Sequence, residues 1–333
     1  MLKKVSILGS GSWGTALAML LSANADKVRL WSRSDKQVQE INHKHVNRNY
    51  LPREEIPANV VATTDLAEMG ECEVLIFCVP SKATRAVAAD AAERIALPPN
   101  APVVCATKGV EKDTGKRITE IVAEYFPDHP IAVISGPNHA EEVARHMATA
   151  TVIGCRDEEA AAKLQQWFTL PWFRTYTSDD VAGIEIGGAA KNVFAIAGGI
   201  AEGLGLGDNA KAALVTRGLA ELSRLGIQLG GRAETFQGLS GMGDLVVTCY
   251  SSHSRNNLVG QMLGKGHTVE EITDSLNMVA EGIPNTESLY EAARRAGIRT
   301  PIIDQVYAII YEDKAPADAL SELLNRDPRP EAE

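Results

Sequence analysis

Two different patterns of hydrophobic and polar positions divide the chain near residue 180. In the first part, short aliphatic runs rich in valine and isoleucine alternate with longer segments of helical periodicity. Short apolar runs separated by helices predict parallel strands that are covered on both faces. The predicted strands are 5–8, 28–31, 60–62, 74–79, 103–107, 131–135, 151–154 and 173–176, and the predicted helices are 13–23, 82–95, 114–126, 139–147 and 158–169.

After residue 179 the β-branched runs disappear, and helical patterns rich in alanine and leucine replace them. This half is predicted to be all-α. The sequence therefore predicts an α/β fold, in which a doubly wound parallel sheet in residues 1–180 is followed by a helical domain in residues 181–333. The predicted helices are 182–201, 210–225, 255–264, 268–276, 286–296 and 302–312.

Composition excludes several function classes. The 333 residues contain 33 Lys+Arg against 43 Asp+Glu and only 5% aromatic residues, which argues against a nucleic-acid partner. No apolar run approaches the ~18 residues of a membrane helix. The apolar run near the N-terminus is shorter than the roughly 7–15 residues of a signal peptide. The five cysteines are odd in number and never spaced C-x-x-C, which is typical of reduced thiols in the cytoplasm.

A glycine motif follows the first predicted strand directly and precedes the first predicted helix. Gly9 is suited to a tight turn, Gly11 to the close approach of a pyrophosphate, and Gly14 to close packing of helix on strand. This context predicts a dinucleotide site of the Rossmann type. The whole motif reads Gly9-Ser10-Gly11-Ser12-Trp13-Gly14, and we expect Ser12 and Trp13 to lie within the turn and to line the same pocket.

Arg33 stands at the end of the second predicted strand, where an NAD-selective site usually carries an acidic residue for the ribose 2′-hydroxyl. A guanidinium pairs with a 2′-phosphate, whereas a carboxylate would repel it. NADP(H) is therefore favoured. NAD(H) is the alternative, because an arginine that stacks on adenine permits both cofactors. A solvated loop arginine is the remaining interpretation.

Three further predicted strands end in unusual residues, in segments 79–81, 106–109 and 135–138. Ligands of open parallel sheets bind outside the carboxyl ends of the strands, so these segments are expected to meet at the nicotinamide and the substrate. Lys108 is suited to hold an anionic or carbonyl oxygen there. An ordinary surface lysine is the alternative.

Lys191 and Asn192 lie in the middle of an almost wholly apolar predicted helix. Burying an unpaired ammonium is unfavourable, so Lys191 needs a partner, a ligand or a wet cavity. Burial also lowers the pKa of a lysine toward neutrality, which suits a proton donor near pH 7. Asp244 and Thr248 are four residues apart on one helical face, and we expect Asp244 to hold Lys191. The alternatives are a lysine that reaches the helix rim and an aspartate that caps its own helix.

Ser254, Arg255 and Asn256 begin another predicted helix. With Ser254 as the N-cap, free backbone N–H groups, a guanidinium and an amide share one helix start, which is typical of a phosphate site. Glu281, in the short polar break 279–282, is a weaker candidate to accept a hydrogen bond from a ribose or a nicotinamide amide.

In this order the segments resemble the bacterial NAD(P)-dependent glycerol-3-phosphate dehydrogenase family. The resemblance covers residues 4–325, and one departure is Asn138-His139, where the family pattern predicts a smaller residue followed by an aromatic one. It implies reversible NAD(P)H-dependent reduction of dihydroxyacetone phosphate to sn-glycerol 3-phosphate, the glycerophospholipid precursor, by a cytoplasmic homodimer. The segments that carry it are GSGSWG, ATKG, SGPNHAEE, EIGGAAKNVFAIAGG, GLSGMGDLVVTC, SRNN and VAEG.

The resemblance also implies a role for each candidate residue and no metal. Lys191 is the proton donor in reduction and the acceptor in the reverse direction, with Asp244 as its catalytic partner. Residues 1–180 become the NAD(P)-binding domain and residues 181–333 the substrate and catalytic domain. The implied cofactor residues are Gly9, Gly11, Ser12, Trp13, Gly14, Arg33, Tyr50, Lys108, Ala140, Arg255, Val279 and Glu281. The implied substrate residues are Lys108, Gly136, Asn138, Lys191, Asn192, Asp244, Thr248, Ser254, Arg255 and Asn256.

Two other functions remain open from the sequence. A β-hydroxyacid dehydrogenase relative also joins a Rossmann domain to a helical domain with a Lys-Asn pair, but it would hold a carboxylate rather than a phosphate. A non-catalytic NADP sensor would keep the glycine turn and would not need a buried Lys191–Asp244 pair.

Overall fold

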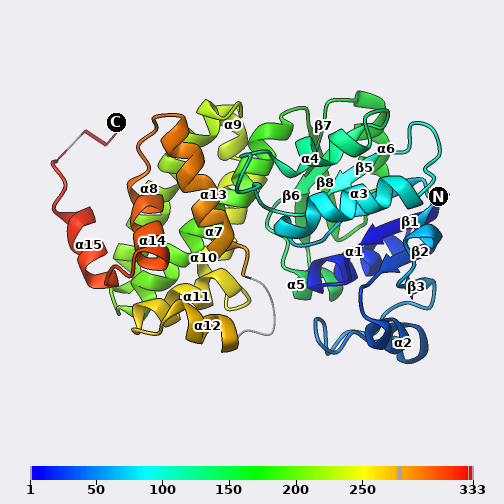
Figure 1. The fold of residues 1–333 in the computed structure, drawn as a ribbon, viewed down its shortest axis with the longest axis horizontal. Coiled ribbons are helices and arrows are strands. Elements are labelled where there is room, and N and C mark those ends of the chain that lie inside the picture. The colour runs from blue at the N-terminus through cyan, green and yellow to red at the C-terminus, as the bar shows by residue number, and fades with distance from the viewer. Residues whose placement is uncertain (1, 276–279, 329, 332–333) are drawn as a thin grey trace.

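The computed structural model describes residues 2–275, 280–328 and 330–331, which form a sheet half and a helical half (Figure 1). The sheet half lies on the right in Figure 1 and the helical half on the left. The last strand ends at Ser178, and the long helix α7 begins at Val181. The predicted α/β fold with a following all-helical region is confirmed.

The sheet has eight strands in the order β3-β2-β1-β4-β5-β6-β7-β8. The chain moves outward from β1 first through β2 and β3 and then, in the other direction, through β4. The loop after β1 therefore lies where the strand order reverses, which is the position of the ligand crevice in open α/β sheets. The strands are β1 (Leu2–Leu8), β2 (Ala25–Trp31), β3 (Val60–Thr63), β4 (Val74–Phe77), β5 (Val103–Cys105), β6 (Ile131–Ser135), β7 (Thr149–Cys155) and β8 (Phe173–Ser178).

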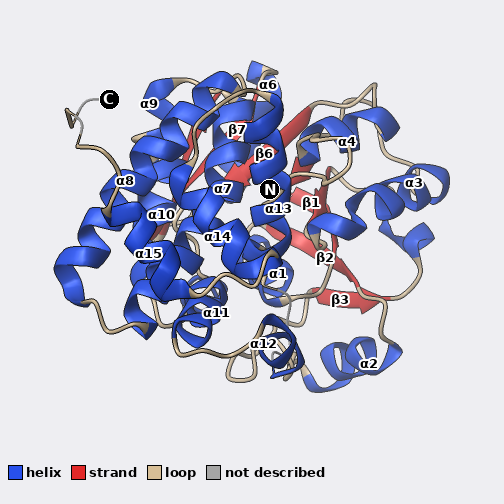
Figure 2. Ribbon diagram, turned by 60° about the vertical axis from the view of Figure 1, so that its left-hand side comes forward, coloured by secondary structure: helices blue, strands red, loops and turns tan. Residues whose placement is uncertain are grey.

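Helices cover both faces of the sheet, as the apolar strands require (Figure 2). In β4, Val74 and Ile76 belong to the same buried cluster as residues of α1 (Ser12–Ser22) and α6 (Glu158–Phe168). The alternate residues Leu75 and Phe77 pack with α3 (Thr84–Arg94) and α4 (Ile118–Tyr125) on the opposite face. Both sets of side chains are buried because successive residues of a strand point to opposite faces.

Two strands, β7 and β8, run against the prediction of an all-parallel sheet, because β8 is parallel to β7. β7 pairs with β6 in the antiparallel direction, while the other neighbouring pairs are parallel. The connection from β6 to β7 contains only the short helix α5 (Ala140–Ala144), which contacts α1. Because this connection does not cross back over the sheet, β7 starts at the edge where β6 ends, and the two strands run in opposite directions.

Several helices differ from the predicted ranges. α2 (Asp35–Lys44) was not predicted, because Val38 and Ile41 are its only apolar residues and only Gln37 and Ile41 are buried. Predicted helices 114–126 and 139–147 shorten to α4 and α5, and predicted helix 286–296 begins earlier, at Gly282 of α13 (Gly282–Arg295). The short helices α9 (Ala233–Phe236) and α15 (Pro316–Leu324) were also not predicted. The helical face expected to carry Asp244 and Thr248 is present in α10 (Asp244–Tyr250).

The helical half is built around α7 (Val181–Gly203), whose residues 181–201 are all buried. It packs most closely on α11 (Arg255–Gly264): a Cβ on Gly199 would lie 2.0 Å from the Asn257 carbonyl oxygen, and one on Gly260 would lie 2.0 Å from that of Ile196. The two backbones therefore touch without side chains between them. The helices that contact α7 include α8 (Gly207–Gln228), α10, α11 (Arg255–Gly264), α13 and α14 (Pro301–Tyr311), and α12 (Val269–Ser275) contacts α11.

The sequence predicted reduced cysteines and no membrane helix. All five cysteines have free thiols. Among the residues that the structure describes, no helix combines the length and the apolar content that crossing a bilayer requires.

Candidate active site

The glycine turn lies at the carboxyl end of β1, above the first turn of α1. Gly9 has φ +117°, and a Cβ there would lie 2.3 Å from the Cys78 carbonyl oxygen. A Cβ on Gly14 would lie 1.9 Å from the Gly9 carbonyl oxygen, whereas a Cβ on Gly11 would have no heavy atom within 4 Å. Gly9 and Gly14 are thus required by the fold itself, and Gly11 leaves open space at the start of α1, which suits a diphosphate.

Ser12 and Trp13 lie in the first turn of α1 rather than within the loop before it. Ser12 Oγ donates to the carbonyl oxygen of Tyr50 at 3.1 Å, which ties the predicted cofactor residue Tyr50 to the glycine turn. The indole nitrogen of Trp13 is buried and, in the described part of the chain, has no hydrogen-bond partner.

A buried polar network that was not predicted supports the glycine turn from below. Gln37 Nε2 and Asn47 Nδ2 both donate to the carbonyl oxygen of Ser10, at 2.7 and 2.9 Å. Asn47 Nδ2 also donates to Thr15 Oγ1 in α1, at 2.8 Å. These contacts fix the Ser10 carbonyl of the loop, and the Gly9 N–H donates to the Trp31 carbonyl oxygen at 3.1 Å. The sequence indicates these contacts only through the polar residues at positions 37 and 47, which belong to no motif.

Arg33 is exposed and lies two residues after the end of β2. The next residue, Ser34, caps α2 by accepting a hydrogen bond from the Gln37 backbone N–H. This turn places Arg33 at the carboxyl edge of the sheet, next to the strand that bears the glycine turn.

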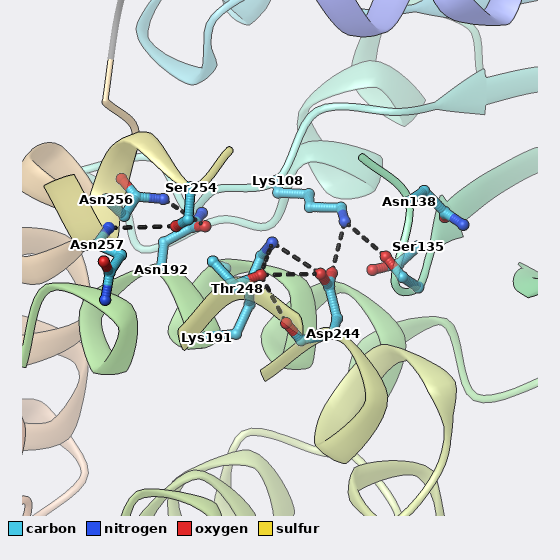
Figure 3. Close-up of polar contacts among 12 residues, drawn as sticks. Lys108, Ser135, Asn138, Lys191, Asn192, Asp244, Thr248, Ser254, Asn256 and Asn257 are labelled. Atoms are coloured by element: carbon cyan, nitrogen blue, oxygen red, sulfur yellow. Dashed lines mark hydrogen bonds and ion pairs between the residues drawn. The ribbon is translucent and has the colours of Figure 1, made fainter. Parts of the chain in front are cut away.

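A cluster of three charged side chains joins the two halves (Figure 3). Lys191 Nζ, from α7, donates to Asp244 Oδ1 at 2.8 Å and to Thr248 Oγ1 at 2.7 Å. Lys108 Nζ, from the loop after β5, donates to the other carboxylate oxygen of Asp244 at 2.5 Å. Lys191 is 7% exposed and Asp244 is 1% exposed. The expected Lys191–Asp244 contact is thus present, and Lys108 is a second partner of the same carboxylate.

The electrostatics of the cluster follow from its burial. Burial lowers the pKa of Lys191 to about 8; the charge of Asp244 opposes this shift, and the charge of Lys108 adds to it. Burial alone would raise the pKa of Asp244, but the adjacent charges of Lys108 and Lys191 outweigh it and hold that pKa below its usual value. The cluster therefore carries an ionised carboxylate beside an ammonium that titrates near neutral pH.

The loop after β6 contributes Gly136 and Asn138. Lys108 Nζ donates to the Gly136 carbonyl oxygen at 3.1 Å, so this loop borders the charged cluster. The Asn138 side chain is turned toward β7, where Nδ2 donates to the Ala150 carbonyl oxygen at 3.0 Å and Oδ1 accepts from Thr151 Oγ1 at 2.9 Å (Figure 3). The structure therefore brings Gly136 to the cluster and not the Asn138 amide.

The start of α11 lies beside Asn192 of α7 (Figure 3). Ser254 caps the helix by accepting from the Asn257 backbone N–H at 3.2 Å, as predicted. Asn256 Nδ2 donates to Asn192 Oδ1 at 2.8 Å, and Asn256 Oδ1 accepts from the Gly282 N–H at 2.9 Å. Arg255 is partly buried at the first position of the helix. The predicted substrate residues Asn192, Ser254, Arg255 and Asn256 thus come together.

Glu281 connects the helical half to the loop after β4. Its carboxylate accepts from Ser81 Oγ at 2.6 Å and from the Ser81 backbone N–H at 3.2 Å, a contact that was not predicted. Burial raises the pKa of Glu281, and the hydrogen bonds from Ser81 oppose that shift. Ala140 is buried at the start of α5, and Val279 lies outside the described residues.

Comparison with known proteins agrees with this geometry. Family models match both halves: the NAD-dependent glycerol-3-phosphate dehydrogenase N-terminus over residues 4–161 and its C-terminus over residues 180–321. The chain is 46% identical over 329 residues to glycerol-3-phosphate dehydrogenase (NAD(P)+) of Lysinibacillus sphaericus, covering 98% of this chain and 97% of that protein. The corresponding protein of Enterococcus faecalis is 44% identical over 337 residues, covering 100% and 98%.

A solved structure resembles the fold over its full length. The crystal structure of glycerol-3-phosphate dehydrogenase from Coxiella burnetii superimposes with a TM-score of 0.93 and 39% identity, covering 97% of this chain and 99% of that one. The chain belongs to the NAD-dependent glycerol-3-phosphate dehydrogenase family.

Proposed function

We infer that this protein catalyses the NAD(P)H-dependent reduction of dihydroxyacetone phosphate to sn-glycerol 3-phosphate and the reverse oxidation. The observation that carries this function is the buried contact of Lys191 with Asp244, beside the helix start that holds Arg255. A nucleotide sensor has no need for a buried proton donor. A hydroxyacid dehydrogenase has no need for a site at the start of α11 that is suited to phosphate.

The residues at the glycine turn fit a dinucleotide cofactor. Gly11 leaves the space that a Cβ would fill, and the N–H groups at the positive end of α1 are suited to bind a pyrophosphate. Arg33 favours NADP(H), with NAD(H) also accepted, and the similar proteins carry NAD(P)+ in their names. The bound nicotinamide supplies the hydride for the carbonyl carbon. Tyr50, Lys108, Ala140, Arg255 and Glu281 are the further cofactor residues of this proposal.

Lys191 moves the proton. With a pKa of about 8, it is mostly an ammonium at pH 7 and donates to the carbonyl oxygen as that oxygen gains charge. Among the described residues, Lys191 Nζ donates two of its three hydrogens to Asp244 and Thr248. The third hydrogen is then directed at the substrate. In the reverse direction the neutral amine accepts the proton. Asp244 orients Lys191 and stabilises its charge.

The substrate spans the space between Lys191 and the start of α11. Lys108 and Asn192 hold its oxygens at the reacting end, next to Gly136. Ser254 shapes the phosphate site as the cap of α11, and Arg255 and Asn256 hold the phosphate through backbone N–H groups, a guanidinium and an amide. The Asn138 amide, bonded to β7, acts on the shape of the loop rather than on the substrate.

The cellular setting is proposed on the same basis. We expect a cytoplasmic homodimer that supplies the glycerophospholipid precursor. The five free thiols suit a reducing compartment, and size-exclusion chromatography with light scattering tests the dimer.

The test of the function is a substrate panel with the purified protein. Oxidation of NADPH is followed with dihydroxyacetone phosphate and with unphosphorylated dihydroxyacetone, and reduction of NADP+ with several 3-hydroxy acids. We expect kcat/KM for the phosphorylated substrate to exceed that for dihydroxyacetone by at least ~10-fold, because a charge-assisted hydrogen bond contributes about 1.5–3 kcal/mol. Faster turnover of a 3-hydroxy acid would indicate the carboxylate-binding relative, and cofactor binding without turnover would indicate a sensor.

A further inference from the structure

His139 lies next to the charged cluster, and the proposed mechanism does not use it. It follows Asn138 at the end of the β6 loop and caps α5, where its carbonyl oxygen accepts from the N–H groups of Glu142 and Val143. Its ring lies against that of His253, with centroids 5.9 Å apart and an interplanar angle of 58°. His253 immediately precedes Ser254, so the two imidazoles connect the sheet half to the proposed phosphate site.

The Nε2 atom of His139 is buried and, among the described residues, has no hydrogen-bond partner. A buried polar atom without a partner costs about 1–3 kcal/mol, and nearly all such atoms in native proteins find one. His253, by contrast, is exposed, and its ring lies against that of His139. The Nε2 atom is therefore suited to bind a ligand oxygen. It becomes accessible when the exposed His253 side chain shifts.

The charged groups around His139 come from three helices. Burial lowers its pKa below the usual value; the charge of Lys191 on α7 adds to this shift, and Asp244 on α10 and Glu141 and Glu142 on α5 oppose it. His253 is a further titratable neighbour, and Lys108 donates to Gly136 in the same loop. The ring is thus neutral at pH 7 in the free protein. A phosphate dianion beside it would reverse the balance, since an opposite charge favours the imidazolium.

We propose that His139 determines specificity for the phosphorylated substrate: its Nε2 donates a hydrogen bond to the substrate phosphate, and the ring takes up one proton from solvent as the substrate binds. This inference rests on the proposed function, because it assigns a further group to the same phosphate site. The bound phosphate raises the pKa of the ring. The contribution of His139 to binding is therefore present at low pH and is lost as the pH rises through that raised value.

The test compares wild type with His139→Phe and His139→Gln at saturating NADPH between pH 6 and pH 8.5. For His139→Phe we expect KM for dihydroxyacetone phosphate to rise about tenfold at pH 6 and less than threefold at pH 8.5, with kcat nearly unchanged. His139→Gln keeps a neutral donor, so its KM relative to wild type rises less. The ionisation of the substrate cancels in these ratios because all variants bind the same substrate. His267→Gln, a change at an exposed histidine of the α11–α12 segment, is the control.

Proton uptake is measured separately by calorimetry. Glycerol 3-phosphate, or inorganic phosphate if no turnover is found, is titrated into the protein in two buffers of different ionisation enthalpy at pH 7. We expect uptake by wild type and by His267→Gln to exceed that of both His139 variants. Equal uptake in all four proteins would overturn the proposal, as would a KM ratio independent of pH or an effect on KM for NADPH alone. Thermal melting shows which variants fold, and His139→Gln carries the test if His139→Phe does not.

Discussion

The two halves of the molecule prepare their parts of the active site in opposite ways. Around the glycine turn, the sheet half offers a space because a Cβ is missing at Gly11, while buried Gln37 and Asn47 hold the loop carbonyl. The helical half instead removes Lys191 and Asp244 from water and pairs them. Cofactor binding should therefore depend on backbone shape and on exposed charge, whereas turnover should depend on one buried side chain. Substitutions on the two sides should separate affinity from rate.

The largest expected effect is on Lys191. We predict that Lys191→Ala lowers kcat by roughly 10²–10⁴ and leaves NADPH affinity nearly unchanged, because general acid catalysis contributes about that factor. The measurement is steady-state kinetics together with cofactor titration. The matched control is Lys211→Ala, since Lys211 is equally buried but pairs with Glu202 at the C-terminal end of α7. Activity of Lys191→Ala within tenfold of wild type would show that another group donates the proton.

A charge reversal at Arg33 tests the sheet half. Arg33→Asp replaces an attraction for a 2′-phosphate with a repulsion and gives a 2′-hydroxyl an acceptor. We predict a change of roughly 10² in the ratio of kcat/KM for NADPH to that for NADH, from about 3 kcal/mol of charge-assisted interaction. The two cofactors are compared at low salt, because screening weakens an exposed pair. An unchanged ratio would make Arg33 a solvated or adenine-stacking residue.

The phosphate end gives a smaller change in affinity. Arg255→Ala is expected to raise KM for dihydroxyacetone phosphate by about 10-fold to 100-fold, from about 1.5–3 kcal/mol for a hydrogen bond to a charged group. Unphosphorylated dihydroxyacetone should hardly respond to the same change. Equal losses with both substrates would place Arg255 away from the phosphate.

The smallest expected effect is on KM for NADPH, and it tests the open space at Gly11. Gly11→Ala adds a Cβ that meets no protein atom within 4 Å, so the melting temperature should stay close to that of wild type. KM for NADPH should still rise by about tenfold, because the methyl group occupies the approach of the pyrophosphate. Gly14→Ala is the contrasting variant, since its Cβ would lie 1.9 Å from the Gly9 carbonyl oxygen and should destabilise the fold. If Gly11→Ala binds NADPH like wild type, the pyrophosphate lies elsewhere.

The sequence predicted best the features that local chemistry determines. A lysine inside an apolar helix requires a partner, so the Lys191–Asp244 contact could be inferred from the residues alone. The strand–turn–helix context of Gly9 identified the glycine turn in the same way. The catalytic and binding roles of these residues stay predictions until the variants are measured.

The features that the sequence did not predict depend on contacts between distant segments. Lys108 meets Asp244 across 136 residues, and no pattern around either residue encodes that approach. The direction of β7 depends on whether α5 crosses the sheet, and the aim of the Asn138 amide depends on that strand. α2 was missed because it contains only two apolar residues, Val38 and Ile41, and buries little of its surface.

The backbone contact between α7 and α11 sets a length scale for the whole reaction. Lys191 lies on one of these helices and the proposed phosphate site is at the start of the other, and at Gly199 and Gly260 the backbones of the two helices are in contact. In the proposed site, the distance between the reacting carbonyl and the phosphate is therefore fixed by two helices whose backbones are in contact. Changes to pocket side chains can tune how tightly a three-carbon substrate is held. Accepting a longer phosphorylated ketone would require the two helices to separate, so chain-length selectivity and the stability of this half cannot evolve independently.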